Sequence, residues 1–332
     1  MASGGSPDQV VSDVDEDAED WVPMPTHLRN SRKTLPATTQ EASTAAPRDT
    51  RDTREKMKLV QQGVWAALEG MEDDPDAAWE VMRQTQVVRR RRPIPLSSEQ
   101  PPGTTRFVCM SDTHNLHDRV DVPPGDVFIH AGDFTMTGLP AEVENFNEFL
   151  GRLPHKEKIV IAGNHELTFD AESYPRTWDR FGHPEAYDCE AVRRSLTNCT
   201  YLEDSEVTVR GYRIYGSPWQ PEFCNWAFNL TRGEKLAKRW SIIPPGVDIL
   251  VTHGPPLGHG DQLTRSRQRT GCVDLLRAVQ TIRPLYHIFG HMHEGYGMTE
   301  DGIGTIYVNA STCNDKYQPI NPCIIFDLPN KA

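Results

Sequence analysis

Five short polar motifs stand out because each follows directly after an apolar run of the kind that forms a buried strand. They are Ser111-Asp112-Thr113-His114, Ala131-Gly132-Asp133, Gly163-Asn164-His165-Glu166, Thr252-His253-Gly254-Pro255-Pro256 and Gly290-His291-Met292-His293. Taken singly, each is more often a surface turn or a hydrogen-bonded core histidine than a site. The carboxyl ends of strands in an α/β sheet, however, converge on one crevice. Together the motifs therefore predict a shared metal site.

The donors of this site are oxygen and nitrogen atoms, without a cysteine. The candidate ligands are Asp112, His114, Asp133, Asn164, His253, His291 and His293. Such a set suits two divalent ions, with Mn²⁺ expected first and Mg²⁺, Fe or Zn²⁺ as alternatives, and does not suit a structural thiolate site. Asn164 is a neutral oxygen ligand, which fits a site that already holds two carboxylates. The adjacent His165 is not needed as a ligand, and we expect it to face the substrate as a catalytic group.

The elements that must position these residues alternate between short β-branched or aromatic runs and helical patterns. Predicted strands are Arg106–Met110, Asp126–His130, Lys158–Ala162, Thr208–Val209, Tyr212–Tyr215, Asp248–Thr252, Tyr286–Phe289, Thr305–Val308 and Ile324–Phe326. Predicted helices are Pro140–Leu150, Cys189–Ser195, Gly233–Trp240 and Val273–Thr281. This alternation predicts an α/β catalytic domain with mixed sheets over residues 104–329.

Residues 1–103 have a different composition, rich in Ser, Thr, Pro, Asp, Glu and Arg. The acidic cluster Asp13–Asp20 and the basic cluster Arg89–Arg92 are typical of a solvated arm, so we expect a largely disordered N-terminal arm. A nuclear-localisation role for the four arginines is a weaker alternative. A helix is expected within residues 54–86, where apolar side chains recur at helical spacing. They are Val60, Val64, Leu68 and Met71, extended by Trp65 and Trp79. This helix packs on the domain or on itself, or else binds a protein partner.

The bulk properties narrow the classes of function. The chain has 332 residues and a formal net charge of −12, which makes duplex nucleic acid an unfavourable partner. No apolar run is long enough to span a membrane, and the first residues lack the features of a signal peptide. The 7 cysteines are scattered and include no C-x-x-C pair, so we expect reduced thiols in a cytoplasmic protein.

The ordered set D-x-H, G-D, G-N-H-E, T-H-G-P-P and G-H-x-H resembles the calcineurin-like metallophosphoesterase superfamily. Longer stretches look like the animal metallophosphoesterase-domain-containing (MPPED) proteins, and they are Phe107–His114, Gly125–Asp133, Lys158–Phe169, Asp204–Trp219, Gly246–Gly258, Phe289–Gly297 and Tyr307–Asn309. The resemblance runs from about residue 104 to 329 and leaves out the N-terminal arm. It implies a four-layer α/β/β/α sandwich of two mixed sheets flanked by helices.

The resemblance also implies a role for each ligand. One metal would be held by Asp112, His114, His293 and a bridging Asp133, and the other by Asp133, Asn164, His253 and His291. A hydroxide that bridges the two metals would attack phosphorus, while His165 stabilises the transition state or protonates the leaving oxygen. Either Glu166 or Asp170 could orient His165. In a related branch, Gly replaces the first histidine of G-H-x-H, which weakens metal binding, whereas this chain keeps His291.

The resemblance implies phosphodiester hydrolysis, with 2′,3′-cyclic or 3′,5′-cyclic nucleotides as the expected substrates. Trp219 could stack a base, or it could be buried under its Pro-rich loop. The segment from His259 to Arg269 holds three arginines that could meet a phosphate, although a solvated loop is the simpler interpretation.

Two further readings of the function stay open. One is a protein Ser/Thr phosphatase, which is disfavoured because Phe134-Thr135 follow Asp133 where those enzymes carry a phosphate-gripping arginine. The other is a nucleotide-binding regulator or scaffold with weak residual activity. A nuclease is disfavoured by the net charge.

Overall fold

Strand β2 (Thr104–Met110) shows how the sequence builds two apolar faces at once. Successive side chains of a strand point to opposite faces of its sheet. Phe107 and Cys109 accordingly lie in the core between the two sheets, whereas Val108 and Met110 lie in the core beneath the helices. Such a strand, buried on both faces, requires a layer of structure on each side. The computed structural model describes residues 63–331 and shows both layers.

One sheet has five strands in the order β14-β2-β3-β4-β5, of which β2 to β5 are parallel and β14 is antiparallel. Its other strands are β3 (Val127–Ala131), β4 (Glu157–Ile161), β5 (Thr200–Tyr201) and β14 (Ile324–Pro329). Parallel neighbours place their carboxyl ends at the same edge. The first three predicted motifs therefore emerge side by side.

The second sheet has seven strands in the order β1-β12-β13-β11-β10-β7-β6, with β7, β10, β11 and β13 parallel. Its strands are β1 (Arg89–Arg91), β6 (Ser205–Val209), β7 (Tyr212–Ser217), β10 (Ile249–Thr252), β11 (Tyr286–Phe289), β12 (Gly297–Glu300) and β13 (Ile306–Asn309). A small separate pair joins β8 (Gln220–Pro221) and β9 (Asn229–Leu230).

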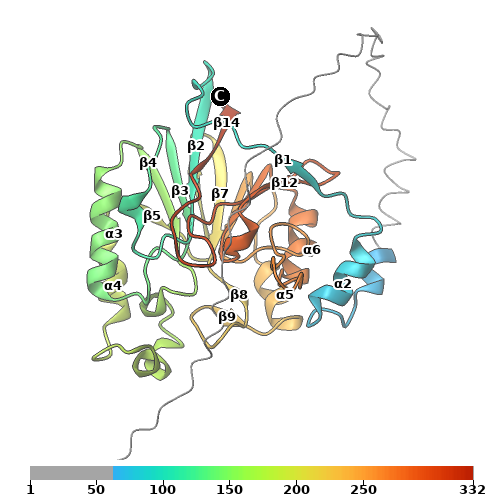
Figure 1. Cartoon of the computed structure of the whole chain (residues 1–332), viewed down its shortest axis with the longest axis horizontal. Coiled ribbons are helices and arrows are strands. Elements are labelled where there is room, and N and C mark those ends of the chain that lie inside the picture. The colour runs from blue at the N-terminus through green and yellow to red at the C-terminus, as the bar shows by residue number, and fades with distance from the viewer. Residues whose placement is uncertain (1–62, 332) are drawn as a thin grey trace, which may run out of the picture. The chain divides into compact units, whose positions relative to one another are not determined.

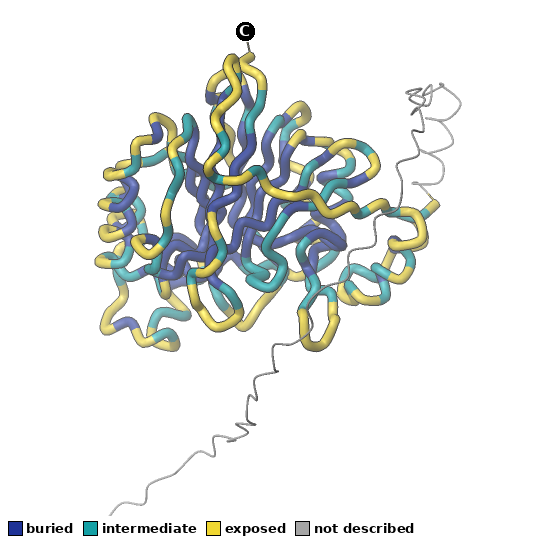
Figure 2. Tube along the Cα trace, turned by 45° about the horizontal axis from the view of Figure 1, so that its top comes forward, coloured by how far each residue is buried: buried dark blue, intermediate teal, exposed yellow. Residues whose placement is uncertain are grey.

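The two sheets pack face to face, and helices cover their outer faces (Figure 1). On the five-stranded sheet lie α3 (Pro140–Arg152) and α4 (Cys189–Ser195), and on the seven-stranded sheet lie α5 (Glu234–Trp240) and α6 (Val273–Ile282). The shared central core and the strand interiors are buried throughout (Figure 2). The predicted four-layer α/β/β/α sandwich of two mixed sheets is thereby confirmed.

Short 3₁₀ turns connect several of these elements, and they lie mainly in the long connections near the strand ends. They are η1 (His117–Arg119), η2 (Leu167–Phe169), η3 (Tyr174–Arg176), η4 (Trp178–Phe181) and η5 (His293–Gly295). η5 begins at His293, a predicted metal ligand, so the backbone turns at the residue that carries this side chain.

The described part of the N-terminal segment differs from the expected disordered arm. Residues 63–67 are helical, and α2 (Pro75–Met82) follows after a break, capped by Asp74, which accepts from Ala77 N at 2.9 Å. Leu68, Ala78 and Met82 are buried against apolar side chains of the catalytic domain, namely Leu257, Val273 and Leu276. Of the alternatives for the helix expected within residues 54–86, packing on the domain fits the described residues. They form two helical pieces instead of one helix. Val60 and the Asp13–Asp20 cluster lie outside the described residues.

The basic cluster also differs from the expectation of a solvated arm. Arg89–Arg91 form β1, the edge strand that pairs antiparallel with β12. The pairing uses backbone hydrogen bonds, which do not depend on side-chain hydrophobicity. An arginine-rich strand therefore leaves no apolar signal in the sequence.

Candidate metal centre

The predicted ligands all lie just beyond the carboxyl ends of five parallel strands. Asp112 follows β2, Asp133 follows β3 and Asn164 follows β4, so three come from the five-stranded sheet. His253 follows β10 and His291 follows β11 in the seven-stranded sheet. The backbones of these loops are joined, because Asp112 N donates to Gly132 O and Gly290 N donates to His253 O, each at 2.9 Å. The site therefore spans both sheets.

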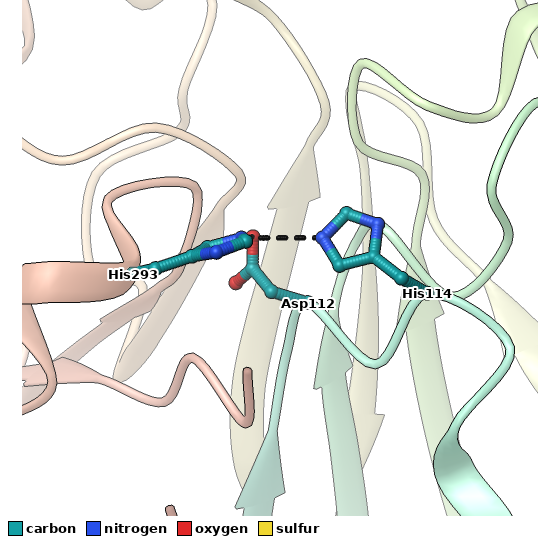
Figure 3. Close-up of side chains that lie close together, drawn as sticks. All are labelled: Asp112, His114 and His293. Carbon is teal, nitrogen blue, oxygen red and sulfur yellow. Dashed lines mark hydrogen bonds and ion pairs between the residues drawn. The ribbon is translucent and has the colours of Figure 1, made fainter. Parts of the chain in front are cut away.

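Asp112, His114 and His293 form the first cluster (Figure 3). His293 Nε2 lies 3.4 Å from Asp112 Oδ1 and 3.2 Å from His114 Nε2. His293 Nδ1 lies 2.9 Å from the Asn314 carbonyl oxygen, to which it donates. Because Nδ1 is occupied by this bond, Nε2 is the nitrogen that faces the cluster, the arrangement typical of a metal-binding histidine.

Asp133, His253 and His291 form the second cluster, and Asn164 joins it. His253 Nε2 lies 3.2 Å from Asp133 Oδ2 and 3.0 Å from Asn164 Oδ1. His253 Nδ1 donates to the Ala131 carbonyl oxygen at 2.9 Å, so Nε2 again faces the cluster. The two oxygens and the Nε2 nitrogen therefore point at a common space.

Asp133 lies between the two clusters. Its Oδ2 atom is 3.2 Å from His253 Nε2 and 4.0 Å from His114 Nε2, which belongs to the first cluster. The other oxygen, Oδ1, accepts the backbone N–H of His165 at 2.9 Å, which fixes the carboxylate. One carboxylate thus reaches both groups of candidate ligands, as the bridging assignment requires.

His165 lies beside the clusters with its own fixed orientation. Its Nδ1 donates to the Met136 carbonyl oxygen at 2.7 Å, and its ring stacks on Trp226 with centroids 4.1 Å apart. Its Nε2 is 4.0 Å from Asp133 Oδ2 and faces the centre. The expectation that Glu166 or Asp170 orients this ring is wrong, because a backbone carbonyl and Trp226 do so.

Histidines supply the main opposing charges for the two carboxylates. Burial alone would raise the pKa of Asp112, but the hydrogen bond and charge of His293 outweigh it and hold that pKa below its usual value. Burial opposes ionisation of Asp133 in the same way, yet the charges of His253 and His165 lower its pKa well below the usual range. Two buried carboxylates in the ionised form favour cations in the space between them.

The histidine pKa values diverge within the centre. Burial would lower the pKa of His253, but Asp133 raises it to about 9. Burial lowers the pKa of His291 to about 3 and that of His114 to about 4. His114 and His291 are therefore neutral near pH 7, the form that donates a lone pair to a metal.

Two glycines make room for the carboxylates. A Cβ atom at Gly163 would overlap Asp133 Oδ1, and one at Gly290 would overlap Asp112 Oδ2 and the Ser111 hydroxyl. Four of the loop residues also have positive φ, namely Asp112, His114, Asp133 and His291. Backbone strain of this kind clusters at functional sites. The donors, their buried charges and the glycine gaps together fit a pair of divalent ions.

Glu166 has a structural role that the sequence pattern did not reveal. Its buried carboxylate accepts the backbone N–H groups of Asp133, Thr135 and Gly163 at 2.8, 2.8 and 2.6 Å, and the Thr135 hydroxyl at 2.8 Å. Burial, followed by the charge of Asp133, raises the pKa of Glu166 to about 8. Glu166 therefore ties the loop after β3 to the loop after β4. The only signal in the sequence was its place in G-N-H-E.

Trp219 packs against side chains that are not part of the metal centre. Its Nε1 donates to Asp204 Oδ2 at 2.9 Å, Arg239 lies over its ring at 4.3 Å, and Phe228 meets it edge-on. Trp219 is only partly buried, so the buried alternative describes this side chain in part. Its proposed role in stacking a base is not supported, because all these contacts are with residues other than the predicted ligands.

Other aromatic side chains do border the centre. Phe223 is 47% exposed, and its ring meets that of His291 at 5.3 Å. Tyr317 is 44% exposed, and its ring lies 4.8 Å from His114. These two, with Trp226 on His165, form an aromatic rim that comes from loops outside the five motifs. Motif spacing could not find them, because their loops approach the centre only after folding.

Comparison with known proteins agrees with this geometry. The family model for calcineurin-like phosphoesterases matches residues 105–295. Metallophosphoesterase domain-containing protein 1 of Homo sapiens is 58% identical over 247 residues, which cover 71% of this chain and 75% of that protein. A UPF0046 protein of Caenorhabditis elegans is 44% identical over 272 residues, which cover 77% of this chain and 68% of that protein.

Two mixed sheets between helices, with Asp, Asn and His side chains gathered at the strand ends, define a metal-dependent phosphohydrolase. The chain belongs to the calcineurin-like phosphoesterase family and, within it, to the metallophosphoesterase-domain-containing proteins. The resemblance predicted from the motifs is confirmed. The family and the Asp/His clusters together indicate a dinuclear divalent metal site. In the part of the chain that the structure describes, no helix is long and apolar enough to cross a membrane.

Proposed function

We propose that this chain is a dinuclear metal-dependent phosphodiesterase that hydrolyses small phosphodiesters, with cyclic nucleotides as the substrate class. The position of Asp133 carries this proposal, because its Oδ2 atom lies within 4.0 Å of a histidine of each cluster. Asp112, His114 and His293 would hold one ion, and Asn164, His253 and His291 the other. Asp133 would hold both. Mn²⁺ is the ion proposed first, with Mg²⁺, Fe and Zn²⁺ as alternatives.

The chemistry divides between the ions and the chain. Two bound divalent ions polarise phosphoryl oxygens and generate a nucleophile from water at neutral pH. The chain contributes His165, whose Nε2 faces the centre because its Nδ1 donates to Met136 O at 2.7 Å. When protonated, Nε2 can donate to a developing charge or to the leaving oxygen. Trp226 restrains this ring against rotation, since their centroids are 4.1 Å apart.

The aromatic rim supports a nucleotide substrate. Phe223 and Tyr317 are 47% and 44% exposed beside the ligands, where a base could stack on either ring. Large exposed apolar side chains favour a ligand with a flat apolar part. This rim replaces Trp219 as the proposed contact for the base.

A protein Ser/Thr phosphatase is less well supported. Phe134, which follows Asp133, is fully buried and stacks on Phe146 at 4.3 Å. Thr135 is equally buried, with its hydroxyl bonded to Glu166 at 2.8 Å. Neither residue can present a cation to a phosphomonoester. A regulator with vestigial activity is also less well supported, because every predicted ligand lies at the centre.

The test is a hydrolysis assay of the full chain with three substrates. They are bis-p-nitrophenyl phosphate, 2′,3′-cyclic AMP and a phosphoserine peptide, each with Mn²⁺, Mg²⁺, Fe²⁺ or Zn²⁺. We expect metal-dependent hydrolysis of the two diesters and little of the peptide. Faster hydrolysis of the peptide would favour the phosphatase, and tight nucleotide binding without turnover of any substrate would favour the regulator.

The proposal also covers the cellular location and a protein partner of the N-terminal segment. We retain the cytoplasmic location, which is supported by the absence of disulfides among the described cysteines. A protein partner for the N-terminal segment stays a hypothesis. It would have to use residues other than Leu68, Ala78 and Met82, whose side chains are already buried against the catalytic domain.

A further inference from the structure

A second cavity, of about 650 Å³, lies apart from the metal centre, since none of the predicted ligands lines it. Three segments that are far apart in the sequence enclose it: the N-terminal segment around β1, the loop from Gly258 to Arg269, and the stretch from Glu294 to Thr299. Its volume is within the range of about 300–1,000 Å³ that is usual for small-molecule sites. We refer to it as the arginine cavity.

Four arginines line this cavity, namely Arg90, Arg91, Arg267 and Arg269. Two of them are neutralised: Arg91 pairs with Glu300 at 2.9 Å, and Arg269 pairs with Asp261 at 2.5 Å. The side chains of Arg90 and Arg267 have no ion-pair or hydrogen-bond partner among residues 63–331. Two exposed arginines thus line one cavity without a partner for their side chains among these residues.

The acidic groups of the lining compensate for only one of these two charges. Asp261 is fully buried and already accepts from Arg269 and from Gly258 N, the latter at 3.0 Å. Glu294 accepts the backbone N–H of Thr264 at 3.0 Å and keeps its negative charge, so the lining retains an excess of one positive charge. The cavity is therefore locally cationic, although the whole chain carries a formal net charge of −12. Local excess of one sign in a concave site concentrates ligands of the opposite sign.

The walls of the cavity are held in place by specific contacts. Arg89–Arg91 pair with Glu300–Met298 as neighbouring strands, which fixes the backbone that carries Arg90. Beneath the Gly258–Arg269 loop, the buried His259 stacks on Tyr307 at 3.6 Å and bonds Thr299 Oγ1 at 2.8 Å. Gln86 meets the other ring nitrogen of His259 at 2.8 Å. The two free arginines consequently belong to anchored segments and not to a loose tail.

We propose that the arginine cavity binds a small organic phosphate that carries at least two negative charges. Guanidinium groups bind phosphate oxygens through paired N–H donors, and two arginines that line one cavity suit such an anion. Tyr296, which is only partly buried in the lining, offers aromatic surface to its organic part. This site is additional to the metal centre and does not depend on the reaction carried out there.

The test compares two double variants of the full, metal-loaded chain. Arg90→Gln with Arg267→Gln removes the two free charges of the cavity. Arg92→Gln with Arg265→Gln removes the same charge from the same two segments at positions that do not line the cavity. The probe is fructose 1,6-bisphosphate, and its binding is measured by isothermal titration calorimetry at two salt concentrations. Hydrolysis of bis-p-nitrophenyl phosphate is measured alongside.

We expect saturable binding to the wild type and to the Arg92/Arg265 variant, and binding at least about tenfold weaker in the Arg90/Arg267 variant, since a hydrogen bond to a charged group is typically worth a tenfold change or more. Hydrolysis should stay unchanged in both variants. Equal weakening in both, or no saturable binding to the wild type, would overturn the proposal. If the Arg90/Arg267 pair does not fold, Arg267→Glu alone must abolish binding.

Discussion

A single carboxylate, that of Asp133, connects the two halves of the metal centre. Its Oδ2 atom is 3.2 Å from His253 Nε2 in one cluster and 4.0 Å from His114 Nε2 in the other. Its Oδ1 atom is held by the backbone N–H of His165 at 2.9 Å. Every other proposed ligand serves one cluster, so loss of this side chain should be the most damaging.

Asp133→Asn should lower the content of both metals, because it removes the negative charge that draws two cations together while keeping the shape of the side chain. Elemental analysis of the purified protein measures both metals at once. Asn164→Asp, which changes the charge in one cluster only, is the matched comparison. If Asp133→Asn retained two full metal equivalents, the bridging role would be refuted.

His165→Ala should separate catalysis from metal binding. Its Nε2 faces the centre, but it is not assigned to either ion, so metal content should stay at the wild-type level. Turnover of bis-p-nitrophenyl phosphate should fall by about 10²–10⁴-fold, which is typical of the loss of one general acid–base group. Loss of metal together with activity would instead make His165 a ligand.

At the scale of the elements, the loops beyond the strand ends depend on Glu166. Its carboxylate accepts three backbone N–H groups and one hydroxyl, all of which are buried. These donors belong to the loops after β3 and β4, each of which carries a proposed ligand. The positions of Asp133 and Asn164 therefore rest on a residue that binds neither metal.

Glu166→Gln should destabilise the fold by about 1–3 kcal/mol, because the amide NH₂ group would face buried N–H donors that a carboxyl oxygen of Glu166 accepts. The free energy of unfolding in urea measures this loss. Glu144→Gln, an exposed change on α3, is the control and should have little effect. A variant as stable as the control would show that water or rearrangement satisfies these donors.

The sequence predicted the strands that carry the ligands because each is an apolar run buried on both faces, as in β2 and β11. The seven ligand candidates from the five motifs likewise lie close together at the ends of these strands. The sequence did not predict β1, because its arginines carry no apolar pattern and pair with β12 mainly through the backbone. Nor did it predict Phe223 and Tyr317 at the centre, because their approach depends on loop conformations such as the positive φ of Cys224, Asn225 and Tyr317.

The packing of the segment before Pro101 reverses an expectation. Its composition predicted a largely disordered arm, but Leu68, Ala78 and Met82 are buried against the domain. Arg106, next to the start of β2, also donates to Ser98 O at 2.7 Å. Removal of the segment would expose the apolar side chains that it covers.

A chain that starts at Pro101 should therefore be less stable than the full chain by several kcal/mol, at about 1.5–3 kcal/mol for each large apolar side chain removed from the core. It should also aggregate more readily. Thermal unfolding and light scattering measure these effects. A chain that starts at residue 51 is the control, since it retains the described contacts. Equal stability of both truncated chains would show that residues 51–100 are dispensable after all.

At the scale of the whole molecule, the metal centre joins the two sheets. Asp112, Asp133 and Asn164 come from the five-stranded sheet, while His253 and His291 come from the seven-stranded sheet. Bound metals would therefore stabilise the sandwich as a whole, since a ligand that binds only the folded state raises its stability. The same arrangement means that the loss of one ligand weakens a contact between the sheets as well as a metal site.

His291→Gly tests whether the assembled molecule is an enzyme or a regulator. His291 has φ 64°, a conformation that Gly adopts without strain, so the variant should fold at least as well as the wild type without added metal. Asp133, Asn164 and His253 remain for the second ion and should hold it less tightly. His291→Asn, which also tolerates positive φ and keeps an oxygen donor, is the matched control.

We expect the metal concentration for half-maximal phosphodiesterase activity to rise at least about tenfold in His291→Gly, since even the loss of an outer partner of a metal ligand costs that much. At saturating Mn²⁺ the activity should largely recover, and His291→Asn should fall between the two proteins. Titration of bis-p-nitrophenyl phosphate hydrolysis with Mn²⁺ measures this, with AMP inhibition measured alongside because the space left by the imidazole favours a bound nucleotide. Equally low activity of wild type and variant at every metal concentration would replace the enzyme with a nucleotide-binding regulator.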